Sequence, residues 1–187
     1  MKKKKKKDIK IIKNFLDKEV FKKLQTFLLG ADCPWFYNES KVSPGCKSNS
    51  PIKGYENNNP HQFTHSFLRG MEWSNWTQNI LPLLDKINPR VWIRVKSNLS
   101  TINSKPLVGG WHCDKHTDGI AWTDTTTSIF YINTNNGYTM FENGQKINCV
   151  ENKLVIFPNN LMHTGVSQTD TKIKVTLNLN YLKNDEI

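Results

Sequence analysis

Two histidines and an aspartate are the residues of this chain best suited to hold a metal ion. One residue separates His112 from Asp114, and His163 follows Asp114 by 49 positions. Alternate residues of a β-strand point to the same side, so a strand through the triplet would present His112 and Asp114 to one cavity. His163 follows the apolar run Leu154–Phe157 and can supply a third ligand from across a barrel. Two imidazoles and one carboxylate leave positions open on an octahedral metal, as in mononuclear non-haem Fe(II) sites.

A second triplet, His116-Thr117-Asp118, has the same spacing and competes for the same role. A His-x-Asp triplet is a weak signal by itself, because so short a pattern also arises by chance. We favour His112 because Val108 to Trp111 predicts a strand leading into it, whereas His116 falls in the polar stretch that follows. His116 and Asp118 remain the alternative to His112 and Asp114.

The last apolar segment, residues 172–181, alternates strictly and predicts a strand with two different faces. One face is apolar, with Ile173, Val175, Leu177 and Leu179, and the other is polar, with Lys172, Lys174, Thr176, Asn178 and Asn180. Solvent exposure would explain a polar face. If this face turns into a barrel instead, a buried lysine requires an anionic partner. A small dicarboxylate such as 2-oxoglutarate is a partner of that kind.

The elements that must position these residues are helices first and strands afterwards. A helix is predicted from Asp17, which can cap it, to Gly30, with its apolar residues at helical spacing. A second helix is predicted over Trp76 to Ile87, where Pro82 must either lie in the first turn or kink the helix. Residues 31–64 are rich in Pro, Gly, Ser and Asn and predict a long irregular excursion.

From Val91 onward the pattern changes to short strands. Asn135-Asn136-Gly137 and Asn143-Gly144 are tight-turn signals that predict two successive hairpins. The expected strands are 9–12, 91–95, 128–133, 138–142, 145–150, 154–157 and 172–181. The fold class predicted is α+β, mainly β, with a double-stranded β-helix (jelly-roll) core and the N-terminal helices packed outside.

The formal net charge of +10 invites a nucleic-acid interpretation that its distribution does not support. Six of the 26 basic residues form one run, Lys2 to Lys7, and without them the net charge falls to +4. Only three basic residues are arginines, although arginine is the residue that binds bases and phosphates through two hydrogen bonds. We therefore predict a disordered Lys-rich tail at residues 1–8 and a single domain at 9–187, and do not expect nucleic acid as the main partner.

The motifs taken together resemble one known family. Gly109-Gly110-Trp111-His112-Cys113-Asp114 surrounds the first two candidate ligands, and His163-Thr164-Gly165 begins with the third. The other matching segments are 129–133, 135–141, 156–157, 169–170 and 174–181, with weaker matches at 34–37 and 94–99. On these residues the chain is similar to the Fe(II)- and 2-oxoglutarate-dependent dioxygenases of the prolyl-4-hydroxylase side, most of all to small versions carried by marine bacteriophages. The likeness extends from residue 9 to residue 182.

The resemblance implies that His112, Asp114 and His163 hold Fe(II) and carry catalysis. It implies 2-oxoglutarate and O2 as co-substrates and the release of succinate and CO2. The hydroxylated substrate is then a protein, with peptidyl proline as the family's example, or a small molecule.

Two positions depart from the family pattern. Lys174 stands where the family usually has the arginine that binds the distal carboxylate of 2-oxoglutarate, with Lys172 as the fallback. Phe130 stands where related hydroxylases often have a tyrosine that contacts the same carboxylate. Three further residues, Asn98, Tyr131 and Asn180, are candidates for the co-substrate pocket.

Two other classes of function remain as alternatives. One is a catalytically silent β-helix domain that acts as a binding or virion module, against which the intact ligand set argues. The other is an oxygenase acting on nucleic acid, which lysines clustered beside the iron site would favour.

No apolar stretch approaches the ~20 residues of a membrane span, and the four scattered cysteines are typical of reduced thiols. We expect a cytoplasmic protein, in the host cytoplasm if a phage encodes it; the sequence does not indicate the oligomeric state.

Overall fold

The computed structural model describes residues 9–41, 60–118 and 120–184. The predicted tail at 1–8 lies outside these residues.

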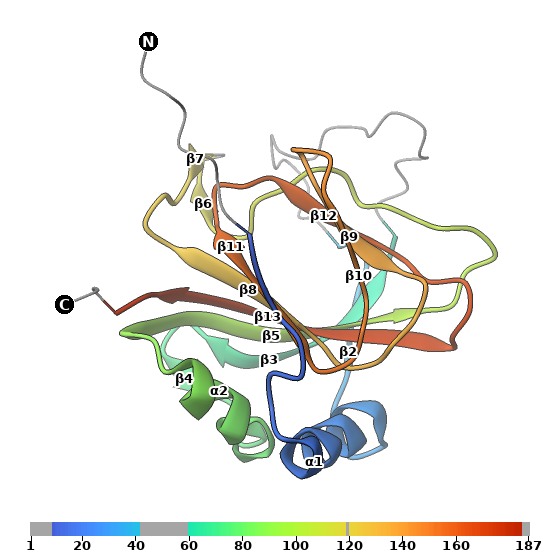
Figure 1. Cartoon of the computed structure of the whole chain (residues 1–187), viewed down its shortest axis with the longest axis horizontal. Helices are drawn as coiled ribbons and strands as arrows, with labels where there is room; N and C mark the ends of the chain where they lie inside the picture. Colours follow the sequence, from blue (N-terminus) through green and yellow to red (C-terminus); the bar gives the residue numbers. More distant parts are fainter. Residues whose placement is uncertain (1–8, 42–59, 119, 185–187) are drawn as a thin grey trace.

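A large antiparallel sheet and a smaller one build the fold (Figure 1). The large sheet has the order β1 (Lys10–Ile12), β11 (Lys153–Pro158), β8 (Thr126–Tyr131), β13 (Ile173–Leu182), β5 (Val91–Thr101), β3 (Gln62–Arg69) and β2 (Phe36–Asn38), with β4 (Glu72–Trp73) also paired to β3. The smaller sheet has the order β10 (Lys146–Asn148), β9 (Tyr138–Phe141) and β12 (His163–Val166). A two-stranded ladder joins β6 (His116–Thr117) and β7 (Ile120–Ala121).

The two main sheets pack against each other around a buried core. Its side chains come from alternate positions of β8 and β11 and from the smaller sheet, and include Ile129, Tyr131, Phe141, Val155 and Phe157. Alternation explains this layer, because every second residue of a strand points inward. The predicted double-stranded β-helix core is confirmed.

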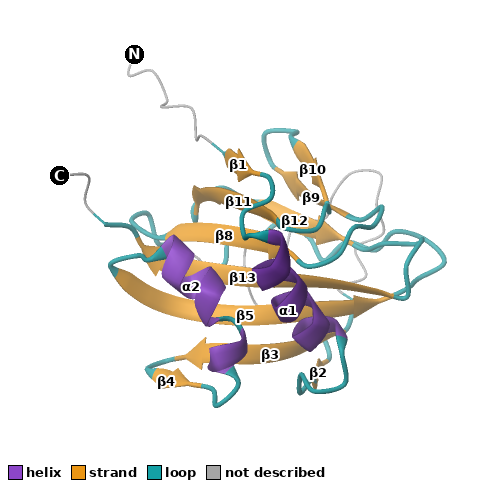
Figure 2. Ribbon diagram, turned by 60° about the horizontal axis from the view of Figure 1, so that its bottom comes forward, coloured by secondary structure: helices purple, strands orange, loops and turns teal. Residues whose placement is uncertain are grey.

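The helices lie on the outer face of the large sheet. Helices α1 (Lys18–Leu29) and α2 (Leu81–Ile87) run across β8, β13, β5 and β3 (Figure 2). They cover a second apolar core to which β13 contributes Val175, Leu177 and Leu179. The two predicted faces of the last strand are therefore real, with the apolar face toward the helices.

Phe130 belongs to this helix-side core. Its ring makes edge contacts with Phe15 and Phe21, at centroid distances of 6.2 and 5.9 Å. The neighbouring Tyr131 points the opposite way, into the layer between the sheets. The side chain of Phe130 therefore does not face the interior between the sheets.

Three local predictions were wrong in detail. The helix expected over 76–87 is broken into a 3-10 turn, η1 (Thr77–Asn79), and the helix α2, which starts only at Leu81 and holds Pro82 in its first turn. Of the excursion expected over 31–64, residues 42–59 lie outside the described residues, and the described part contains β2 and the start of β3. The segment 108–111 forms isolated bridges at Val108, which pairs with Val166, and at Trp111 rather than a strand, while the loop expected at His116 contains β6.

The turn signal at residues 135–137 was also misinterpreted. It does not close a hairpin, because β8 pairs with β11 and β13 whereas β9 pairs with β10 and β12. The chain crosses here from the large sheet to the smaller one. The second signal, Asn143-Gly144, does close the hairpin between β9 and β10, with Gly144 at φ +86°.

Candidate metal centre

His112, Asp114 and His163 come together inside the jelly roll. One ligand atom from each, an imidazole nitrogen or a carboxylate oxygen, lies within 4.8 Å of the other two. Among the described residues this is the only group of three or more His, Cys, Asp or Glu side chains close enough to share a metal ion. Two imidazoles and one carboxylate fit a divalent metal of the iron type, with positions left open.

The backbone fixes the distance between the two histidines. His112 and His163 form an isolated antiparallel bridge, in which each backbone N–H donates to the carbonyl of the other, at 3.1 and 2.9 Å. Their ring centroids are 4.7 Å apart. A strand of the smaller sheet thus places one ligand, and a two-bond bridge holds the 112–114 segment beside it.

Both imidazoles turn the same nitrogen toward the backbone. Nδ1 of His112 lies 3.3 Å from the carbonyl of Gly110, and Nδ1 of His163 lies 3.3 Å from that of Leu161. A carbonyl only accepts, so each Nδ1 carries the hydrogen and Nε2 keeps its lone pair. This hydrogen bonding leaves both Nε2 atoms as the ligand atoms.

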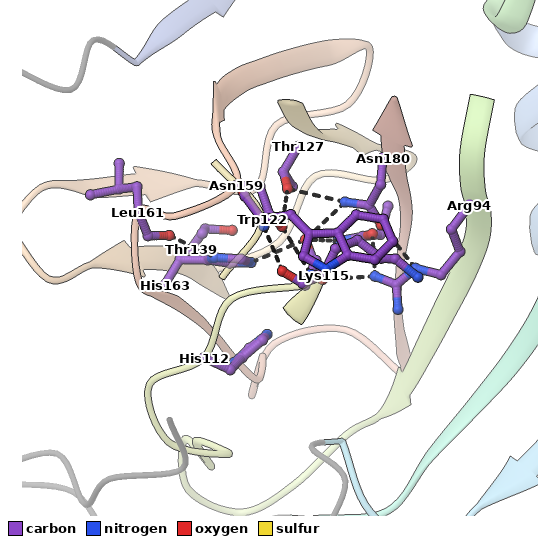
Figure 3. A network of polar contacts seen from close by, with 12 residues as sticks. Arg94, His112, Lys115, Trp122, Thr127, Thr139, Asn159, Leu161, His163 and Asn180 are labelled. Atoms are coloured by element: carbon purple, nitrogen blue, oxygen red, sulfur yellow. Dashed lines mark hydrogen bonds and ion pairs between the residues drawn. The ribbon is translucent and has the colours of Figure 1, made fainter. Parts of the chain in front are cut away.

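Three side chains orient the carboxylate of Asp114. The guanidinium of Arg94 donates to Oδ1 at 2.8 Å, and the amides of Asn178 and Asn180 donate to Oδ2 at 3.0 and 3.3 Å. Arg94 also donates to the amide oxygens of both asparagines, at 2.9 Å each, so the four side chains form one network (Figure 3). β5 and β13 supply these three residues and hold the carboxylate in one orientation.

The protonation states suit metal binding at neutral pH. Burial, followed by the charge of the neighbouring His163, lowers the pKa of His112 to about 4. Burial also lowers the pKa of His163. Burial alone would raise the pKa of Asp114, but the Arg94 charge, followed by the two imidazoles, brings it well below its usual range. The cluster therefore offers neutral imidazoles and an ionised carboxylate, the forms that bind metals.

A buried asparagine anchors the loop that follows the triplet. Oδ1 of Asn159 accepts from the Lys115 N–H at 2.9 Å, and its amide donates to the carbonyls of Lys115 and Trp122 at 2.7 and 3.0 Å. Asn159 also accepts from Thr127 at 3.3 Å, which ties this loop to the network around Asp114 (Figure 3). The sequence contains no local pattern that marks Asn159 for this role.

The three clustered residues line a cavity of about 200 Å³. Lys174 lies in its wall, buried, and its ammonium donates to the carbonyl of Val166. The fallback Lys172 is exposed and lies outside the cavity wall. Of the other candidates, Asn98 lines the cavity, Tyr131 bonds Thr139 with its hydroxyl at 2.7 Å behind the wall, and Asn180 contacts Asp114.

The rival triplet is divided by the structure. His116 lines the same cavity but does not belong to the metal-ligand cluster. Asp118 is exposed, with φ +49°. The geometry thus favours His112 and Asp114 as the pair that acts with His163.

Sequence reasoning missed Arg94, Lys96 and Lys41 as residues of this cavity. Arg94 and Lys96 alternate with apolar residues along β5, a pattern that any half-exposed strand shows. One signal was available, because Arg94 is one of only three arginines in a lysine-rich chain. Lys41 lies in the excursion, where no periodic pattern could assign it a direction.

The fold and the cluster together define a class of protein, namely a jelly roll that holds two imidazoles and a carboxylate in its interior. No family model matches the sequence, and no curated protein sequence matches it. Solved structures do share the fold. An oxidoreductase of the 2OG-Fe(II) oxygenase family from Burkholderia pseudomallei has a TM-score of 0.62 at 11% identity, covering 95% of this chain and 88% of its own.

Two hydroxylases also share the fold. A Trichoplax adhaerens prolyl hydroxylase, in complex with a hypoxia inducible factor peptide, has a TM-score of 0.62 at 15% identity, with 94% and 83% of the two chains covered. The viral collagen prolyl hydroxylase of Paramecium Bursaria Chlorella virus-1 has a TM-score of 0.53 at 15% identity, with 94% and 96% covered. The chain therefore has the fold of the 2OG-Fe(II) oxygenases over nearly its whole length.

Among the described residues, no helix is long and apolar enough to cross a membrane.

Proposed function

We propose that this protein is an Fe(II)- and 2-oxoglutarate-dependent dioxygenase that hydroxylates a protein or small-molecule substrate. The observation that carries the proposal is the cluster of His112, Asp114 and His163, with both Nε2 atoms left as ligands inside a jelly-roll cavity. The shared fold supports it, because the solved structures named above include oxygenases and prolyl hydroxylases.

With Fe(II) bound, the site would supply oxidative decarboxylation of 2-oxoglutarate by O2, with release of succinate and CO2 and addition of a hydroxyl group to the substrate. The chain itself supplies binding and orientation. The imidazoles and Asp114, which line the cavity, would hold the metal there. Arg94, Asn178 and Asn180 keep the carboxylate ionised and fixed, and the Nδ1 bonds keep both rings in the binding tautomer.

Lys174 binds the distal carboxylate of 2-oxoglutarate in this proposal. It is buried in the cavity wall, and its contact with a backbone carbonyl leaves ammonium hydrogens available for an anion. Asn98 and Thr176, which pair across β5 and β13, line the same wall and offer polar groups to the co-substrate. A lysine makes a single-point contact where an arginine makes two, so the co-substrate is held by fewer hydrogen bonds.

The direct test is an anaerobic titration of the protein with Fe(II) and 2-oxoglutarate. A visible charge-transfer band should appear, and succinate should form when O2 is admitted. His112→Ala and His163→Ala should each abolish the band, whereas His116→Ala should leave it. A well-folded, metal-loaded protein that shows neither the band nor succinate would contradict the proposal. Loss of the band in His116→Ala alone would move the ligand role to the rival triplet.

A second candidate, an oxygenase acting on nucleic acid, is kept because three lysines line the cavity: Lys41, Lys96 and Lys174. All three are at least half-buried and lie within the cavity wall. A phosphate backbone needs cations along an exposed track, since it is bound through several successive phosphates. The position of these lysines therefore favours a small anion over a nucleic acid.

A further inference from the structure

The cavity holds more positive charge than the metal site and the co-substrate use. In the described part of the chain, four cationic side chains line it, namely Lys41, Arg94, Lys96 and Lys174. Among the described residues that line it, Asp114 is the only carboxylate. Arg94 is engaged with Asp114 at 2.8 Å, and the proposed function assigns Lys174 to 2-oxoglutarate. Lys41 and Lys96 remain without a role.

Lys96 lies beside the metal cluster. It follows Arg94 by two positions on β5 and so points to the same face, together with Asn98 and Ser100, which also line the cavity. Its charge acts on both His112 and Asp114. An anion paired with Lys96 would therefore lie close to the open positions of the metal.

Lys41 lines the same cavity and lies near Lys174. Its backbone carbonyl accepts from the amide of Gln62 at 3.5 Å, and Gln62 is a buried residue of the cavity wall. Its charge acts on that of Lys174. Lys41 and Lys96 thus face one space from β5 and from the segment that precedes β3.

Burial of a positive charge is costly for both lysines, and the single carboxylate near Lys96, Asp114, is already bound by Arg94. Burial, with the like charge of Lys174, lowers the pKa of Lys41 to about 7. Burial, with the like charge of Arg94 and against the opposite charge of Asp114, lowers the pKa of Lys96 to about 8. A buried cation is retained at least cost when an anion pairs with it. Bound Fe(II) would add two positive charges, and 2-oxoglutarate would add only two negative ones, so the excess of positive charge persists in the loaded site.

We propose that the primary substrate carries a carboxylate, which Lys96 and Lys41 bind beside the metal. This inference rests on the proposed function and narrows its substrate class. A cavity of about 200 Å³ admits a small organic acid or a single acidic side chain of a peptide. Both sources present the same group, so the probes must separate them.

The test measures a second ligand added to the anaerobic protein already saturated with Fe(II) and 2-oxoglutarate. Butyrate is compared with its neutral analogue butyramide, and acetyl-Ala-Asp-Ala-amide with acetyl-Ala-Asn-Ala-amide. Binding is followed by calorimetry and by the change in the charge-transfer band, which must persist to show that 2-oxoglutarate is not displaced. We expect at least one carboxylate to bind about tenfold or more tightly than its amide, since the amide lacks the charge.

The variants Lys41→Met and Lys96→Met keep the length of the side chain and remove its charge. Each should weaken carboxylate binding by about tenfold or more and leave amide binding unchanged. Lys172→Met, which removes an exposed cation of the same chain, should change neither. The small acid responding alone would identify a small-molecule substrate, and the Asp peptide responding alone a peptide substrate.

Equal binding of carboxylates and amides, or unchanged carboxylate binding in Lys96→Met, would overturn the inference. Oligothymidylate is added as a separate probe for nucleic acid. Binding of oligothymidylate without binding of any carboxylate would overturn the inference in favour of a nucleic-acid substrate. Failure of the proposed function has a different signature, because the charge-transfer band would then be missing before any second ligand is added, and this inference would fall with it.

Discussion

At the scale of single residues, Arg94 decides how well the metal site is prepared. It holds Asp114 at 2.8 Å and binds the two asparagines that contact the other carboxylate oxygen. Removing the side chains that orient metal ligands commonly costs 10- to 100-fold in metal affinity. We expect Arg94→Met to weaken Co(II) binding by about that factor, measured by absorption titration of the metal-free protein. Arg69→Met, an exposed arginine of β3, is the control and should bind Co(II) normally. Unchanged affinity in Arg94→Met would show that the asparagines suffice.

Lys174 and Lys172 form a natural pair for testing the co-substrate contact. They lie on the same face of one segment, but Lys174 is buried in the cavity wall and Lys172 is exposed. We expect Lys174→Met to raise the 2-oxoglutarate concentration at half-maximal charge-transfer absorbance by about tenfold or more, because a charge-assisted contact is lost. Metal affinity should not change. Lys172→Met should behave as the wild type, and the reverse result would move the contact to Lys172.

The residues with chemistry were predictable from sequence where type and spacing agree. His112, Asp114 and His163 have the ligand types and the strand parity of a metal site, and the structure brings them together. Arg94 was not predictable, because its partner Asp114 is 20 residues away and only the pairing of β5 with β13 brings Asn178 and Asn180 beside it. A contact made by sheet topology leaves no local pattern in the sequence.

At the scale of elements, strands with clear alternation or tight-turn signals were predictable, whereas β2, β3 and β12 and the choice of partner strands were not. The alternation over 172–181 indicated both faces of β13 correctly, since period-two patterning follows from the backbone itself. The segment 135–137 has the residues of a hairpin turn, yet the chain crosses there to the other sheet. Turn chemistry reports the local backbone, whereas the choice of partner strand depends on packing elsewhere in the chain.

One asparagine adds to the pairing of β1 with β11 in holding the N-terminal segment to the sheet. The buried side chain of Asn152 accepts from the Leu16 N–H at 2.8 Å and donates to the Leu16 carbonyl at 2.7 Å, directly before α1. Its φ of +55° lies in the left-handed region, which asparagine tolerates better than alanine. We expect Asn152→Ala to lower the free energy of unfolding by about 2–4 kcal/mol, measured by urea denaturation.

A substitution at Asn88 measures the cost of the backbone conformation without the loss of the two side-chain hydrogen bonds. It has φ +42° at the end of α2, but its side chain is exposed. Asn88→Ala should cost only about 1 kcal/mol, which is the conformational part alone. Equal losses in Asn88→Ala and Asn152→Ala would mean that the two bonds to Leu16 contribute nothing.

At the scale of the whole molecule, the jelly roll concentrates positive charge inside itself. The large sheet presents apolar residues to the helices and, from β5 and β13, cationic and amide side chains to the interior. The composition shows that the chain is rich in lysine, but it does not show where the lysine side chains lie. Lys96 faces the interior only because the two sheets pack against each other. The buried positive charges of this cavity therefore lower the stability of the fold while they favour binding of an anion, a trade-off that is common at functional sites.

This opposition predicts how the stability of the metal-free protein depends on pH. Lys96 has a pKa of about 8 in the folded protein and about 10.4 when unfolded. Between these values the unfolded chain binds more protons, so the free energy of unfolding rises with pH. The cost of burying the charge is present in full below pH 8 and is relieved above it. Lys41, with a pKa of about 7, acts in the same direction from a lower pH.

Urea denaturation at pH 7, 8 and 9 in the wild type and in Lys96→Met measures this effect. At pH 7 the variant should be more stable by about 1 kcal/mol, because a buried charge has been replaced by an apolar chain of similar length. The advantage should shrink toward pH 9, where Lys96 of the wild type has lost its proton. Parallel pH profiles for the two proteins would show that solvent already neutralises the cost, and a less stable variant at pH 7 would show that Lys96 is paired inside the protein. The predicted loss of carboxylate binding together with a gain in stability is a result that neither a purely structural lysine nor a solvated one would produce.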